Sequence, residues 1–168
     1  MKDLSLKEKL LPSLLDRLID DAPHEKKESR KERVQTLQGH REDVLRDLEW
    51  LMNTECLESA HDLSQYPLVA QSVVNYGMPS LAGSALSAVD VAGIEKRIAA
   101  AILNFEPRIL KDTLEVRSAY ASEDSPLNSL TFEIVGDLWA LPIPQRVFLR
   151  TELDLETGNI DVSQVTER

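Results

Sequence analysis

The stretch that decides the fold is VAGIEKRIAAAILNFEPRIL, residues 91–110. Its apolar residues recur at three- and four-residue steps, the spacing of one stripe along a helix. Pro107 has no N–H for a helical hydrogen bond and disfavours helical geometry at the residue before it, so the helix should end near Phe105. The sequence therefore predicts a helix that packs on a core and then turns into extended chain. The stripe consists of Ile94, Ile98, Ala101, Ile102 and Phe105.

Glu106, Pro107 and Arg108 form the corner that follows this helix. Residues two apart in extended chain point the same way, which sets the Glu106 carboxylate beside the Arg108 guanidinium. A carboxylate at a helix C-terminus meets the negative end of the dipole, at a cost of about 0.3–1 kcal/mol when exposed, so Glu106 needs a cationic or N–H partner. Two interpretations are open: a local ion pair that shapes the corner, or a docking site for another protein.

The chain before residue 91 contains further helical patterns. Residues 10–19 predict a short amphipathic helix, residues 34–54 a longer one and residues 63–77 a third, with Ser64 as its N-cap and Gly77 as its end. Residues 78–90 read as a loop in which Asp90 caps the next helix. The first helix is too short to be stable alone and must dock on its own domain or on a neighbour.

Residues 20–33 mix acidic and basic side chains with almost no apolar residue, a composition typical of a solvated linker. This divides the chain into an N-terminal helix and charged linker, residues 1–33, and a main domain, residues 34–168.

After Pro107 the apolar period changes from helical to two. Residues 110–120, 130–138 and 147–155 predict three half-buried strands, and residues 160–162 a short fourth after a turn at 156–159. Short connections favour antiparallel pairing in a meander. The expected fold class is α+β, with N-terminal helices packed on one face of a small C-terminal antiparallel sheet. Pro142 and Pro144 predict a stiff extended link between two of the strands.

The last predicted strand is short and lies at an edge. Its unpaired N–H and C=O groups could accept a strand from another protein, or the edge could simply be blunted.

Composition excludes several classes of function. The chain has 168 residues, 42% of them hydrophobic, and a net charge of -10, which disfavours nucleic-acid and anionic-membrane partners and favours a protein partner. The single cysteine, Cys56, is expected to be half-buried at a helix end, and nothing suggests an oxidising compartment. With no signal-peptide pattern or membrane span in the sequence, a cytoplasmic location is expected.

The sequence contains few residue patterns that indicate catalysis. The histidines His24, His40 and His61 are too far apart for a zinc motif and are expected at the surface, and no glycine-rich phosphate loop or nucleophile elbow occurs. No metal, cofactor or catalytic residue is therefore predicted. The alternative is a carboxylate-pair glycosidase using Glu106, Glu133 or Glu152 with the two acids roughly 5–10 Å apart. Few aromatic side chains are available to stack on sugars, which disfavours it.

Five pieces of the chain, in order, resemble a known family: the TssE-like baseplate subunits of the bacterial type VI secretion system, related to a wedge protein of contractile phage tails. The first four span the helices, and the last spans a strand and turn. Departures are small: Met52 and Met78 stand where leucine is common. The pieces are SLLDRL at 13–18, RDLEWLMNT at 46–54, YGMPSL at 76–81, ILNFEPRI at 102–109 and RTELDLETG at 150–158.

The resemblance implies a structural baseplate component, not an enzyme, that joins other wedge subunits and provides a platform for contractile sheath assembly around the inner tube. Its expected partners are wedge subunits, sheath subunits and inner tube or spike proteins. Its expected place is the cytoplasmic side of the inner membrane, reached through the baseplate. The family's Glu-Pro-Arg motif falls on Glu106, Pro107 and Arg108, which are the implied partner-binding residues. The family carries an old lysozyme-like label, yet it resembles no lysozyme in its motifs, so the label does not indicate activity. A peptidoglycan-cleaving muramidase is the alternative function, and a free-standing α+β binding domain from another pathway is a third.

Overall fold

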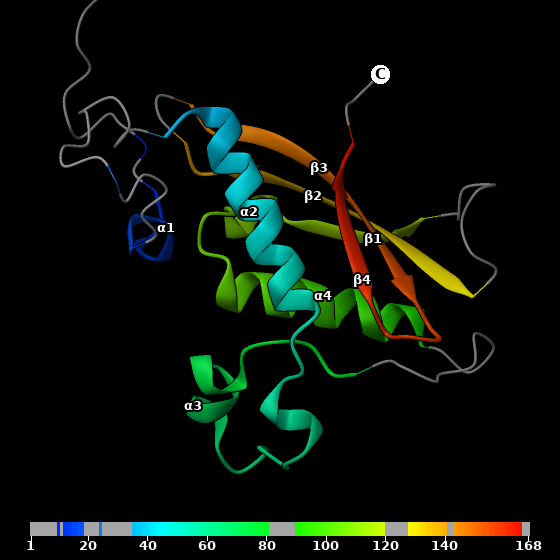
Figure 1. The fold of residues 1–168 in the computed structure, drawn as a ribbon. Coiled ribbons are helices and arrows are strands. Elements are labelled where there is room, and N and C mark those ends of the chain that lie inside the picture. The colour runs from blue at the N-terminus through cyan, green and yellow to red at the C-terminus, as the bar shows by residue number, and fades with distance from the viewer. Residues whose placement is uncertain are drawn as a thin grey trace, which may run out of the picture.

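The computed structural model describes residues 10, 12–18, 24, 35–80, 90–119, 128–140 and 143–165. Helices come first and the sheet last, as expected (Figure 1). The predicted linker at 20–33, except His24, lies outside the described residues, as do residues 81–89 and Pro142. The α-helices are α1 (Leu14–Leu18), α2 (Leu37–Met52), α3 (Pro67–Ala70) and α4 (Val91–Phe105), and the strands are β1 (Glu115–Ala119), β2 (Ser129–Leu138), β3 (Gln145–Asp154) and β4 (Ile160–Gln164). Within the described residues the 3-10 helices are η2 (Leu57–Ser59), η3 (Val73–Asn75) and η5 (Lys111–Thr113).

The four strands form one antiparallel meander in the order β1-β2-β3-β4. On one face Ile134 lies opposite Leu149, and both are buried against the helices. On the other face Glu133 lies opposite Arg150 and forms an ion pair with it at 3.2 Å. One face on the core and one on solvent is the arrangement that period-two patterning predicts, and the α+β expectation is confirmed.

The main helices cover the inner face of the sheet. α4 contacts β1, α2 contacts β4, and the two helices contact each other. Their buried stripes meet sheet residues such as Phe132 and Leu153 in one core. Asp90 is the N-cap of α4, its carboxylate accepts the Gly93 N–H at 3.0 Å, and the helix ends at Phe105, so both of its predicted ends are confirmed.

The predicted helix at 63–77 is wrong. The segment contains only one turn of α-helix, α3, and the 3-10 turn η3, and Tyr66 rather than Ser64 holds the N-cap position. Two short turns replace one helix because the chain must reach the extended bridge between Glu55 and Met78. Gly77 permits this with a φ of 122°, and a Cβ there would lie 2.2 Å from the Thr54 carbonyl oxygen.

Strand β1 starts later than predicted. The sequence predicted extended chain from residue 110, but η5 occupies residues 111–113 and the strand begins at Glu115. The Thr113 hydroxyl donates to the Leu110 carbonyl at 2.8 Å and accepts the Asp137 N–H at 2.9 Å. This local turn outweighs the alternating pattern.

Two burial predictions are also wrong. His40 is 6% exposed because it falls on the same stripe of α2 as Val44 and Leu48, and Cys56 is buried at 5% exposure, not half-buried. His24 and His61 are exposed, as expected.

Candidate protein-binding site at the helix-to-sheet corner

The corner after α4 is held by an ion pair between Glu106 and Arg108. The Glu106 carboxylate accepts the Arg108 backbone N–H at 3.0 Å and the guanidinium Nε–H at 2.7 Å, and a second guanidinium nitrogen lies 2.5 Å from its other oxygen. Glu106 is 4% exposed. The predicted pairing of Glu106 with Arg108 is confirmed, and the Glu106 carboxylate is buried.

The backbone of the corner joins the helix to the sheet. The Glu106 N–H donates to Ile102 at 2.8 Å, which closes the last turn of α4. Trp139 then donates to the Arg108 carbonyl at 2.7 Å, and Leu110 donates to the Asp137 carbonyl at 2.9 Å. The corner is therefore fixed on both sides, and the exposed Pro107 ring lies at its tip.

Asp47 of α2 is a further member of this site. Its carboxylate lies 2.6 Å from the Arg108 guanidinium and 2.9 Å from that of Arg46. Arg46 also reaches Asp16 of α1 at 2.8 Å and lies over the ring of Trp50. A continuous row of alternating charges therefore links α1 to the corner.

This environment stabilises the charged form of Arg108. Burial alone would lower the pKa of Arg108, but the hydrogen bonds and negative charges of Glu106 and Asp47 raise it above its ordinary value. Burial lowers the pKa of His40, and the positive charge of Arg108 lowers it further. Tyr76 packs edge-on against Phe105 with ring centroids 5.4 Å apart, which supports the end of α4.

Sequence reasoning missed Asp47 and Arg46. Both lie in the quoted stretch RDLEWLMNT, but no spacing rule relates them to residues some 60 positions away. An acidic residue facing the core side of α2 was the available signal.

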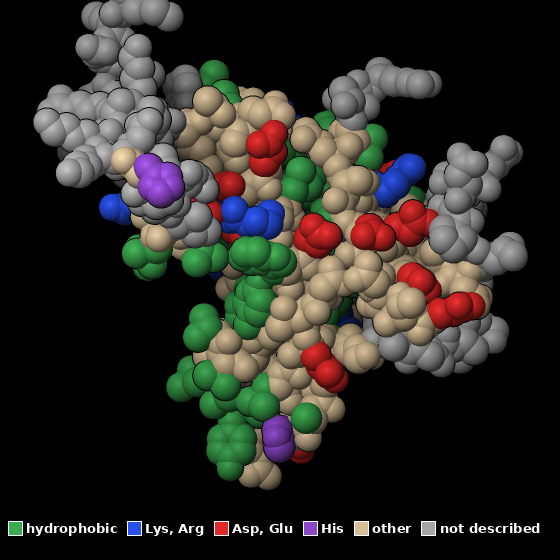
Figure 2. All heavy atoms as spheres, in the orientation of Figure 1, with side chains coloured by type: hydrophobic (Ala, Val, Ile, Leu, Met, Phe, Trp, Pro, Cys, Tyr) green, Lys and Arg blue, Asp and Glu red, His purple; other side chains and the backbone are tan. Residues whose placement is uncertain are grey.

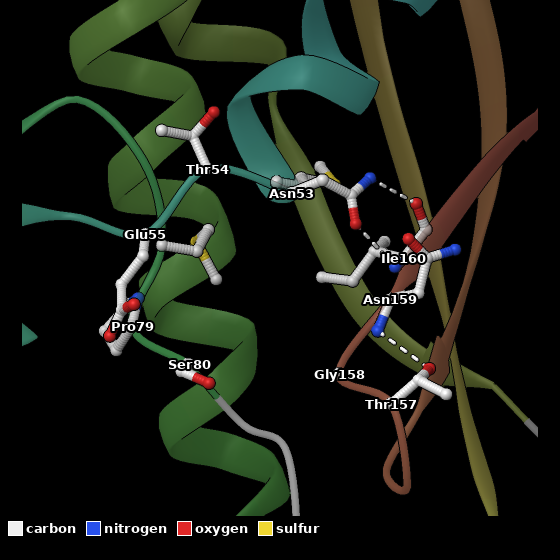
Figure 3. Close-up of a pocket in the computed structure, with 11 residues that line it drawn as sticks. Asn53, Thr54, Glu55, Pro79, Ser80, Thr157, Gly158, Asn159 and Ile160 are labelled. Carbon is white, nitrogen blue, oxygen red and sulfur yellow. Dashed lines mark hydrogen bonds between the residues drawn. The ribbon is translucent and has the colours of Figure 1, made fainter.

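The carboxylates proposed for a glycosidase are not brought together as a free pair. Both Glu106 oxygens bond Arg108, while Glu133 and Glu152 lie on the outer face of the sheet, in β2 and β3. An open hollow of about 280 Å³ lies between the end of α2, residues 78–80 and the turn before β4 (Figure 3). Its one acidic lining residue is Glu55, and none of the three candidate acids lines it.

Exposed apolar side chains lie on α1, on the end of α2 and around α3. Figure 2 shows them as green groups along one side of the molecule. The leucines of α1 face outward, with Leu14 at 72% and Leu18 at 75% exposure, while Leu68 reaches 85% and Val73 80%. Contiguous exposed apolar surface is a feature of protein–protein and membrane interaction sites. No described helix has the length and apolar content to span a membrane.

Residues 38–142 match the family model described as baseplate wedge protein gp25. The match covers more than half of the chain and defines its class, a structural component of a phage-tail-like baseplate. The chain belongs to the gp25 family of baseplate wedge proteins. No curated protein and no solved structure matched.

Proposed function

We propose that this chain is a baseplate subunit of a type VI secretion system that joins wedge subunits and starts the contractile sheath around the inner tube. The gp25 family supports a baseplate role, and the five motif pieces that resemble TssE support the secretion system. Its partners would be wedge and sheath subunits and the inner tube or spike. Assembly would occur in the cytoplasm at the inner face of the membrane.

The observation that carries the proposal is the corner of Glu106, Pro107 and Arg108. Glu106 fixes Arg108 through three hydrogen bonds, and Arg108 retains 21% side-chain exposure beside Asp47. Pro107 is exposed at the tip. A preorganised cation next to a rigid apolar ring suits a partner's carboxylate, because its geometry is already set before binding.

The division of labour at the corner follows from burial. Glu106 is too buried to contact a partner directly, so it acts as a positioning residue for Arg108. Pro107 and Arg108 would make the contact itself. In the motif, Glu106 therefore positions Arg108, and Pro107 and Arg108 are the two residues that contact the partner.

The open edge of β4 provides a second surface. β4 pairs with β3 on one side, and no described strand pairs with its other side. An extended segment of a sheath subunit could add there through main-chain hydrogen bonds. The corner that binds wedge subunits and the β4 edge that binds the sheath would thus be separate surfaces of one small domain.

The test uses Pro107→Lys, which changes the exposed tip and removes no described ion pair. We expect the variant to unfold at the temperature of the wild type and to be lost from purified baseplates. Arg150→Ala, on the outer face of the sheet, is the matched control and should assemble. A folded Pro107→Lys protein that assembles as well as the control would contradict the proposed role of the corner.

A further inference from the structure

Asn53, the residue that caps α2, reaches the outer edge of β4. Its amide nitrogen donates to the Ile160 carbonyl at 2.7 Å, and its amide oxygen accepts the Ile160 N–H at 2.9 Å (Figure 3). A primary amide offers one donor and one acceptor to these groups, the same pair that a residue of a neighbouring strand would offer. At Ile160 the edge of β4 is therefore already occupied.

The pairing of β4 with β3 determines which other backbone groups of β4 point away from β3. Asp154 donates to the Asn159 carbonyl at 2.9 Å, and Val165 donates to the Phe148 carbonyl at 2.9 Å. Hydrogen-bonded and non-bonded pairs alternate in an antiparallel ladder, so the backbones of Val162 and Gln164 point away from β3, as that of Ile160 does. No residue in the described part of the chain bonds these two outward backbones.

We infer that Asn53 sets the register of the segment that adds to β4. The added strand pairs with Val162 and Gln164 and stops before Ile160, where the Asn53 side chain takes its place. This inference rests on the proposed strand addition and names the residue that controls it. Without a fixed stopping point the added strand can shift along β4 by two residues, because such a shift keeps its two faces and the side-chain pattern does not oppose it.

Charge and burial around the edge describe the segment that fits. Val162 is half-buried against the core, so a side chain added beside it on that face should be apolar. Asp161 is exposed on β4, and Glu49 is exposed one turn before Asn53 on α2. Figure 2 shows acidic side chains over this part of the molecule, and the chain carries a net charge of -10. The occupant is an extended, basic segment of a sheath subunit.

The experiment places a photo-reactive amino acid at position 164 and assembles the full-length protein with the sheath subunits. The attached sheath residue is then mapped by mass spectrometry. Wild-type protein should attach at one position. Asn53→Ala should attach additionally at a position two residues away, because the edge at Ile160 is then free. Thr54→Val, which removes only a bond from the Thr54 hydroxyl to the Trp50 carbonyl, is the control and should give the wild-type position.

A second measurement needs no Asn53 variant. In the wild-type assembly, hydrogen exchange of the attached sheath segment should show slow amides opposite Val162 and Gln164 and fast exchange at the residue that would lie opposite Ile160. Slow exchange at that residue, or one unchanged attachment position in Asn53→Ala, would overturn the role of Asn53 while strand addition stands. Assembly with no attachment from position 164 would instead overturn strand addition itself.

Discussion

Asp47 and Arg108 lie 61 positions apart in sequence, yet their side chains meet at 2.6 Å. The contact ties α2 to the corner that follows α4, and the same guanidinium nitrogen also bonds Glu106. Arg108 therefore serves two carboxylates at once.

Removing the cation should destabilise the fold. Arg108→Ala leaves the buried Glu106 carboxylate without its partner, a loss of about 3–5 kcal/mol in the free energy of unfolding. Arg150→Ala breaks an exposed pair with Glu133 and should cost no more than about 1 kcal/mol. Urea unfolding of both variants measures the difference. Equal stabilities would show that the corner pair does not support the fold.

Gly77 should tolerate no side chain. Gly77→Ala forces a methyl group against the Thr54 carbonyl at a φ of 122°, so we expect a loss of more than about 1 kcal/mol. Gly39→Ala is the matched control, because a Cβ there meets only side-chain atoms of Gln35 and Thr36, none closer than 3.4 Å. It should stabilise the protein by up to about 1 kcal/mol. Thermal unfolding distinguishes the two, and a neutral Gly77→Ala would contradict the strained turn.

His40 should make stability depend on pH. Burial, aided by the charge of Arg108, lowers the pKa of His40 below its ordinary value of 6.5. Below about pH 6.5 the unfolded chain then binds more protons than the folded one, so the contribution is complete above that pH and is lost as the pH falls. His40→Gln should flatten the change in unfolding free energy between about pH 7.5 and 5.5. His61→Gln, at an exposed position, should keep the wild-type slope.

The leucines of α1 should serve a partner and not the fold. α1 is joined to α2 by the ion pair between Asp16 and Arg46 at 2.8 Å, while Leu14 and Leu18 face outward. We propose that residues 1–33 act as an appendage whose leucines bind another wedge subunit. The double substitution Leu14→Ser and Leu18→Ser should leave unfolding unchanged and reduce capture of wedge subunits from cytoplasm. Unchanged capture would place the partner elsewhere.

Much of the fold follows from periodicity. The stripe of α4, its cap at Asp90 and its end before Pro107 are local properties, and so is the alternation in β2 and β3. The helix predicted at 63–77 is wrong because its helix signals are short. Contacts with Glu55 and residues near it decide the path of this segment. The surface position predicted for His40 is wrong because the buried stripe of α2 contains this polar residue as well as apolar ones.

The site was predictable only in part. Glu106 and Arg108 are two residues apart, so their pairing is a local event that the sequence reveals. Asp47 and Asn53 act across 61 and 107 positions, respectively, and no pattern within one chain marks such contacts. Both lie in the stretch 46–54 that carries the family resemblance, but the sequence does not indicate which residues they contact.

The measurement that tests the account most directly is the composition of baseplates purified from cells that carry Pro107→Lys in place of the wild-type chain. The account predicts a variant with unaltered thermal unfolding that is absent from the purified wedges, while Arg150→Ala is retained. Wedges that contain the Pro107→Lys chain at the level of the control would contradict it.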